Sequence, residues 1–345
     1  MAADTPFVPQ LVSSVHMPAR DIPMPTTISA QAQFTLSMLS QVPKQVMPPQ
    51  GDAAGWDAYM ALRAPVNEQI TSAMALATTG VVVPEVASTV ERLEFGTASV
   101  YVATPFGTDT ADPRIFFNIH GGGFTDGGGV VAEQSTQYVA GSYGVRTWGM
   151  DYRMLPQHPY PAGLDDCMIA YRELLKVRRP EDIAVGGLSA GANLTAALLL
   201  RAHSEGLPMP AAAVLYSIPG DLTQSGDTYQ TNRFMMASDG LGLLGELYAG
   251  DHDIRNPLVS PLFADYPADF PPTILIAGTR DFLLSDTSLL HRKLRSAGVR
   301  TELFIFEGAP HGGFGGRAPE DHEQVEIVRS FLEREWTNSG NGAEA

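Results

Sequence analysis

The sequence predicts an α/β fold in which helices cover both faces of a mostly parallel β-sheet. From about residue 90 to residue 336, short apolar runs typical of strands alternate with segments that have helical apolar spacing. Clusters of glycine follow some of these runs, as expected where a buried strand ends in a turn. The chain has 345 residues, of which 44% are hydrophobic, so it can bury the large core that this fold requires.

The N-terminal part, residues 1–85, lacks the alternation of strand and turn. Prolines interrupt its first half, and residues near 54–75 have helical apolar spacing, with Trp56, Tyr59, Met60 and Leu62 on the apolar positions. Because a sheet domain rarely begins with so much non-strand sequence, we expect a helical cap segment over residues 1–85.

The catalytic domain is expected over residues 86–336. Two alternating stretches, 90–95 and 98–103, predict half-buried antiparallel strands. Apolar runs then predict strands at 115–119, 145–150, 183–186, 212–216, 273–277 and 302–306, with helices at 163–178, 190–204, 285–297 and from the last strand to Trp336.

Two segments depart from this alternation. Residues 217–258 are rich in Met, Gly and Leu, and we expect a second cap insertion there, with ordinary helical packing as the alternative. Met235, Met236 and Leu241 would then line an apolar pocket or belong to the core. Residues 337–345 have small and turn-forming side chains without apolar periodicity, which predicts a disordered tail.

Charge and cysteine usage limit the partners and the compartment. The net charge of −16 repels nucleic-acid phosphates and anionic membranes, so we expect neither as a partner. Because Cys167 is the single cysteine, no intrachain disulfide is possible, which suits a reducing cytoplasm. Its sequence context predicts a buried position in a helix. We expect no signal peptide, because the first residues lack a basic region followed by an apolar run. We also expect no membrane-spanning helix, because no apolar run reaches about 18 residues.

Ser189 is the expected nucleophile. It is the centre of Gly187-Leu-Ser-Ala-Gly191, which follows the strand at 183–186 and opens a helix. A sharp strand-to-helix turn exposes the serine, and glycines are needed where side chains would clash with the neighbouring backbone. The N-terminus of the helix places positive potential where negative charge develops.

A run of three glycines predicts an oxyanion hole. His120-Gly-Gly-Gly-Phe124 follows the strand at 115–119, and successive glycines let backbone N–H groups converge on one point. We expect Gly122, Gly123 and Ala190 to donate, and His120 to hold the loop. A phosphate-binding loop is disfavoured because no Walker-type lysine follows.

His311 and Asp281 are the expected partners of the serine. His311 lies on a glycine-rich loop after the final strand, where it can act as general base. Asp281 follows the strand at 273–277 and can orient His311; Asp286 competes for this role but fits better at the start of the next helix. The order Ser, Asp, His is that of α/β-hydrolases.

These motifs together resemble the bacterial hormone-sensitive-lipase-like esterases of the α/β-hydrolase superfamily. The matching residues are His120–Phe124, Asp151–Ala162, Gly187–Gly191, Ser260–Leu262, Asp281 and His311-Gly. The resemblance implies an eight-stranded sheet with a helical cap. It further implies hydrolysis of short or small carboxylic esters through an acyl-enzyme, with no cofactor and often a homodimer. No histidine pair has the spacing of metal ligands, so no metal is expected.

Three segments differ from the commoner family pattern. Leu188 stands where Asp or Thr is common, Phe282 follows the acid where Pro is common, and Leu155-Pro-Gln-His158 replaces Ala-Pro-Glu-His. These variants are similar to a subgroup that includes a monoterpene ε-lactone hydrolase. A lactonase or amidase using the same residues, and a non-catalytic ligand-binding protein, are the alternatives. The presence of His311 argues against a pure binding protein.

Overall fold

The computed structural model describes residues 19, 21–42, 46–49, 51–52, 54–59, 61, 88–109, 111–236, 241–316 and 318–342. Eight strands form one sheet in the order β1-β2-β4-β3-β5-β6-β7-β8. Their bounds are β1 Ser88–Phe95, β2 Ala98–Pro105, β3 Ile115–Ile119, β4 Arg146–Asp151, β5 Ile183–Leu188, β6 Ala212–Tyr216, β7 Thr273–Gly278 and β8 Thr301–Phe306.

The first strands are antiparallel and the rest are parallel. β2 pairs antiparallel with both β1 and β4, whereas β4, β3, β5, β6, β7 and β8 run parallel. This arrangement confirms the predicted fold class and the eight strands. The register brings Ile119 opposite Gly187, so the glycine loop after β3 and the serine turn after β5 leave the same edge of the sheet side by side.

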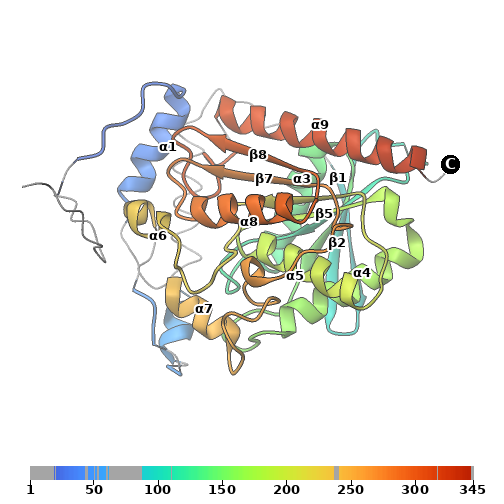
Figure 1. Ribbon diagram of the computed structural model, residues 1–345, viewed down its shortest axis with the longest axis horizontal. Helices are drawn as coiled ribbons and strands as arrows, with labels where there is room; N and C mark the ends of the chain where they lie inside the picture. The colour runs from blue at the N-terminus through green and yellow to red at the C-terminus, as the bar shows by residue number, and fades with distance from the viewer. Residues whose placement is uncertain are drawn as a thin grey trace, which may run out of the picture.

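Helices cover both faces of the sheet. In Figure 1, α9 runs along one face, and α4, α5 and α8 run along the other. The helices are α1 Ala30–Ser40, α3 Val130–Tyr143, α4 Ala162–Val177, α5 Ala190–Ser204, α6 Thr228–Thr231, α7 Leu241–Ala249, α8 Leu284–Ser296 and α9 Pro319–Gly342. Short 3-10 turns lie at Pro180–Asp182, Arg233–Met235 and Pro261–Phe263.

Alternation along β3 shows how the two cores form. Ile115 and Phe117 pack in the cluster that contains residues of α4 and α5, whereas Phe116 packs with α9 residues such as Phe331. Successive side chains of a strand point to opposite faces, so a strand covered on both faces is apolar throughout. All five residues of β3 are buried accordingly.

Helix α3 was not predicted from the sequence. Its buried positions, Ala132, Thr136 and Ala140, are small and not strongly apolar, so the segment shows no hydrophobic stripe. Small residues are required there because α3 lies close against β4: a Cβ on Gly149 would lie 1.7 Å from Thr136 Oγ1.

The expected cap segments are described in part. In Figure 1, α1, α6 and α7 gather on one side of the molecule, far from the C-terminal end of α9. Trp56 and Tyr59 lie in a helical turn and are buried against the main core, as their spacing suggested. Residues 62–87, including Leu62, and Met60 lie outside the described residues.

The C-terminus is helical beyond Thr337, where a disordered tail was predicted. Helix α9 continues to Gly342, because its earlier turns are held by buried Val328, Phe331 and Trp336 and the following residues extend the helical hydrogen bonding. Thr337 Oγ1 donates to the carbonyl of Glu333 in this extension. Residues 343–345 lie outside the described part of the chain.

Candidate active site

Ser189 occupies the turn between β5 and α5. Its backbone has φ +57° and ψ −123°, a region that non-glycine residues rarely adopt. Its amide donates to the carbonyl of Tyr216 at the end of β6 (2.8 Å), which holds the turn to the neighbouring strand. Such local strain persists only where surrounding structure enforces it, and it is concentrated at functional sites.

The glycines beside Ser189 are fixed by close backbone approach. A Cβ on Gly191 would lie 1.9 Å from the carbonyl oxygen of Ile119, and one on Gly187 would lie 2.4 Å from the same atom. No side chain fits at either position without separating the turn from β3. The G-x-S-x-G pattern is therefore the sequence signature of this close contact.

His311 lies between Ser189 and Asp281. Its Nε2 is 3.0 Å from Ser189 Oγ, and its Nδ1 is 3.2 Å from Asp281 Oδ1. The His311 side chain is 26% exposed, whereas Asp281 is fully buried. The structure therefore brings the three residues predicted from separate loops into one hydrogen-bonded line.

Asp281 is anchored by two further hydrogen bonds. Its Oδ1 also accepts from the amide of Leu283 (2.9 Å), and its Oδ2 accepts from Ser217 Oγ (2.5 Å). Ser217 is fully buried, has φ +49° and directly follows β6. Ser217 was not predicted from the sequence, although a polar residue directly after a parallel strand was an available signal.

Asp286, the competing acid, has a different environment. It lies in the first turn of α8 and accepts from the amide of Asp221 (2.9 Å) and the hydroxyl of Tyr229 (3.0 Å). Burial, reinforced by the nearby Asp221 carboxylate, raises the pKa of Asp286 to about 7. Asp281, not Asp286, contacts His311.

The three expected oxyanion donors surround Ser189. Gly122 and Gly123 have φ +116° and +60°, conformations that suit glycine, and Ala190 is the first residue of α5. Within the described part of the chain, the amides of these three residues donate no hydrogen bond. They line the same cavity as Ser189 and His311. An unpaired amide beside a nucleophile can receive negative charge that develops on a substrate oxygen.

His120 holds the glycine loop rather than contacting Ser189. Its Nδ1 donates to the carbonyl of Gly121 (2.7 Å), and its ring stacks on Tyr152 at a centroid distance of 4.3 Å. Tyr152 also donates its hydroxyl to the His120 carbonyl (3.1 Å). Burial lowers the pKa of His120 to about 4, so the ring is neutral near pH 7.

The cavity above Ser189 has a volume of about 410 Å³ and a mainly apolar wall. Both expected cap segments reach this wall, which includes Leu39 of α1, Met47, Met235 and Leu244. Met236 is instead buried against Tyr229 and Phe282. The ring of Phe282 also packs against the ring of His311, with the two ring centroids 4.7 Å apart.

Within the ranges given above, no three His, Cys, Asp or Glu side chains are arranged to hold a metal ion. Among the described helices, none combines the length and apolarity needed to cross a membrane.

Comparison with known proteins finds an α/β-hydrolase family and proteins described as esterases. Residues 116–314 match the sequence model of a family described as alpha/beta hydrolase fold. An esterase from Acinetobacter venetianus is 32% identical over 203 residues, which cover 56% of this chain and 66% of that protein.

Solved structures extend the similarity to most of the chain. The crystal structure of esterase E25 has 31% sequence identity and a TM-score of 0.79, and covers 92% of this chain and 98% of its own. An esterase from the bacterial hormone-sensitive lipase family has 26% identity and a TM-score of 0.72, with 89% of this chain and 99% of its own covered.

Proposed function

The chain belongs to the alpha/beta hydrolase fold family, and from this membership we propose that it hydrolyses small carboxylic esters with Ser189 as nucleophile. The activity is that of a carboxylic ester hydrolase, in agreement with the esterase structures it resembles. One observation carries the assignment of the residues: Ser189, His311 and Asp281 form a hydrogen-bonded line beside three unpaired amides.

In the first step, Ser189 Oγ attacks the ester carbonyl carbon. His311 Nε2, 3.0 Å away, accepts the serine proton as the bond forms. Asp281 then stabilises the imidazolium through Nδ1. The substrate carbonyl oxygen becomes an oxyanion that the amides of Gly122, Gly123 and Ala190 can bind. Each such donor contributes on the order of a hundredfold in rate.

Collapse of this intermediate breaks the bond to the alcohol oxygen. His311 returns its proton to that oxygen, and the alcohol leaves an acyl group on Ser189. A water molecule then loses a proton to His311 and attacks the acyl carbonyl through a second oxyanion. Release of the carboxylic acid restores the Ser189 hydroxyl, and no redox or metal step is needed in this sequence.

The wall of the cavity favours small esters. A volume of about 410 Å³ lies in the lower part of the range of small-molecule sites, roughly 300 to 1,000 Å³. Leu39, Met47, Met235 and Leu244 present apolar atoms to it. We therefore propose that residues 1–85 and 217–258 act as caps that limit acyl length.

Hydrolysis of p-nitrophenyl esters of increasing acyl length tests this proposal. Wild type should cleave short esters fastest, and Ser189→Ala should lose this activity almost entirely. Ser204→Ala, at the exposed end of the same helix, is the matched control and should keep full activity. Retention of activity by Ser189→Ala would refute the nucleophile.

Inactivity of wild type on every chain length would refute simple esterase action. Lactones and amides are the next substrates to assay, since ring opening and amide cleavage use the same nucleophile and base. A cleaved lactone would identify the lactonase alternative, and saturable binding without turnover would identify a binding protein.

A homodimer and a cytoplasmic location belong to the proposal as well. The single cysteine, Cys167, suits a reducing compartment. The charge of −16 argues against nucleic acid as a partner. Sedimentation velocity of the full chain distinguishes dimer from monomer.

A further inference from the structure

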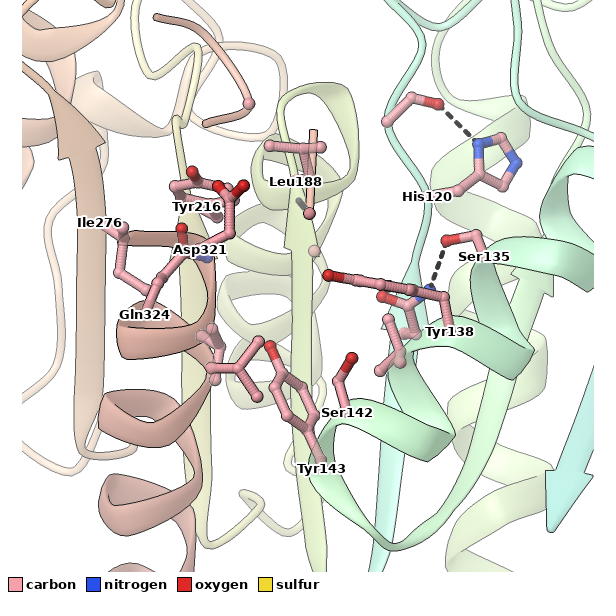
Figure 2. A pocket seen from close by; sticks show the side chains of 18 of the residues that line it. His120, Ser135, Tyr138, Ser142, Tyr143, Leu188, Tyr216, Ile276, Asp321 and Gln324 are labelled. Carbon is pink, nitrogen blue, oxygen red and sulfur yellow. Dashed lines mark hydrogen bonds between the residues drawn. The ribbon is translucent and has the colours of Figure 1, made fainter. Parts of the chain in front are cut away.

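A second cavity, with a volume of about 350 Å³, lies behind the nucleophile turn. Figure 2 shows it between the carboxyl ends of the central strands and two helices, α3 and α9. Leu188 and Gly312 line both this cavity and the cavity above Ser189, so the two spaces adjoin. None of the catalytic residues proposed above lines the second cavity.

Hydroxyl groups are concentrated on its wall. Figure 2 shows the hydroxyls of Tyr138 and Tyr143 pointing from α3 toward the space that Tyr216 faces from the end of β6. Ser135 and Ser142 add two further hydroxyls, and the intervening surface is apolar, with Val139, Val214 and Ile276. We name this space the tyrosine cavity, after Tyr138, Tyr143 and Tyr216.

Two of these hydroxyls have no internal partner. Tyr143 and Tyr216 donate no hydrogen bond to any group of the described chain, whereas Tyr138 interacts with Ser142. Burial raises the pKa of both Tyr143 and Tyr216, so both phenols keep their protons and can donate. Neither hydroxyl oxygen is among the fully buried, unpartnered atoms of the described residues, so each is open to the cavity and can bond a polar ligand atom there.

Charge on the wall selects against anions. Asp321 is the charged side chain among the described residues of the wall, none of which is Lys or Arg. Its carboxylate is stabilised locally, accepting from the amides of Phe314 (2.9 Å) and Ala318 (3.0 Å). Gln324 and Asp321 also provide acceptors near Tyr216: a Cβ on Gly313 would lie within 4 Å of polar atoms of all three side chains.

We propose that the tyrosine cavity is a second small-molecule site, which binds a neutral alcohol with a compact apolar body. The alcohol oxygen accepts from Tyr143 or Tyr216, its proton is donated to an acceptor of the wall, and its apolar body contacts Val139, Val214 and Ile276. A carboxylate is repelled by Asp321 and finds no cationic partner among the described wall residues. The site is separate from ester cleavage and does not depend on Ser189 being the nucleophile.

The probe for this site is 2-phenylethanol, titrated into full-length protein labelled with ¹³C on the tyrosine rings. We expect the signals of Tyr138, Tyr143 and Tyr216 to shift with one common dissociation constant, of about 1 mM or below for a ligand of this size. Tyr229, which lines the cavity above Ser189, reports on the competing site, and Tyr101 on β2 reports on non-specific effects. Individual Tyr→Phe variants assign the signals.

Variants then separate the tyrosine cavity from the catalytic one. Tyr143→Phe and Tyr216→Phe should each weaken binding about three- to tenfold, since each removes one hydrogen bond. Val139→Phe should block binding by filling the space, whereas Tyr101→Phe should leave the dissociation constant unchanged. A shift confined to Tyr229, or equal affinity in all four variants, would overturn the proposal.

Ligands with the same aromatic body test the chemical class. Phenylacetate should bind at least about tenfold more weakly than 2-phenylethanol, because its carboxylate meets Asp321. Phenethylammonium should bind no more tightly than the alcohol, because an ammonium group has no lone pair to accept from the hydroxyl of Tyr143 or Tyr216. Tighter binding of either ion would overturn the assignment to neutral alcohols, and an absence of tyrosine shifts with all three would overturn the site.

Discussion

Removal of the Ser217 hydroxyl should impair catalysis although Ser217 lies outside the predicted triad. Ser217 Oγ donates to Asp281 Oδ2 at 2.5 Å, and both side chains are fully buried. The other carboxylate oxygen already accepts from Leu283 and His311. Ser217→Ala therefore leaves one oxygen of a buried carboxylate without the hydrogen bond that fixes its plane.

The size of the effect follows from the charge on Asp281. Hydrogen bonds to charged groups contribute about 1.5 to 3 kcal/mol, so Ser217→Ala should lower the free energy of unfolding by about 2 kcal/mol. A carboxylate free to turn should also hold His311 less well, and we expect kcat to fall about tenfold. This is far less than the roughly 10⁴-fold loss expected when the acid itself is neutralised.

The assay compares Ser217→Ala with Thr273→Val in urea unfolding and in steady-state kinetics on a short p-nitrophenyl ester. Thr273 is equally buried, and its hydroxyl donates to Pro271 at the amino end of β7, far along the strand from Asp281. Both variants should lose stability, but only Ser217→Ala should lose kcat. If kcat of Ser217→Ala equals that of Thr273→Val, Ser217 does not position the acid.

Three further changes test the packing and the buried titratable groups. Gly191→Ala should destabilise the protein by more than about 3 kcal/mol in urea unfolding, because the new Cβ would lie 1.9 Å from the carbonyl oxygen of Ile119. Gly242→Ala is the control and should be neutral or stabilising, because no heavy atom would lie nearer than 3.6 Å to its Cβ. The stability of wild type relative to Asp286→Asn should fall as pH rises from about 4 to about 7 and then level off. Because the pKa of Asp286 is raised, its carboxyl group keeps a proton in the folded state that it has lost in the unfolded state. A difference in stability between wild type and Asp286→Asn that does not change with pH would contradict the raised pKa. Burial raises the pKa of the Cys167 thiol, so Cys167 should resist iodoacetamide at about pH 8 until urea unfolds the chain. Mass spectrometry measures the labelling, and rapid labelling of the folded protein would contradict the burial of Cys167.

Features set by local sequence were predicted well. The eight strands and the positions of Ser189, Asp281 and His311 follow from short patterns, because an apolar run, a glycine pair and the residue after a strand are all local. The ends of parallel strands meet at one edge of the sheet, so residues on three separate loops could be assigned to one site before their distances were known.

Features set by long-range packing were not predicted. Helix α3 buries Ala132, Thr136 and Ala140 against a close-lying strand, which leaves no hydrophobic stripe in the sequence. Ser217 acquires its partner 64 residues away, and no local pattern marks it. The tyrosine cavity likewise depends on where α3 and α9 meet the sheet, which only the three-dimensional arrangement reveals.

The C-terminal segment illustrates the limits of prediction from composition. Low periodicity after Trp336 suggested a tail, yet a helix nucleated by buried residues extends through Asn338 and Ser339 to Gly342. Propagation of an existing helix needs far less favourable sequence than its nucleation.

Covalent trapping of the nucleophile tests directly whether Ser189 carries the acyl group during hydrolysis. Diethyl p-nitrophenyl phosphate is incubated with wild type and with Ser189→Ala, and the modified peptide is located by tandem mass spectrometry. We expect one diethylphosphoryl group per chain, on Ser189, with loss of ester hydrolysis in proportion to labelling and no label on Ser189→Ala. A label on another residue that abolishes hydrolysis, or full inactivation of hydrolysis with Ser189 unmodified, would contradict it.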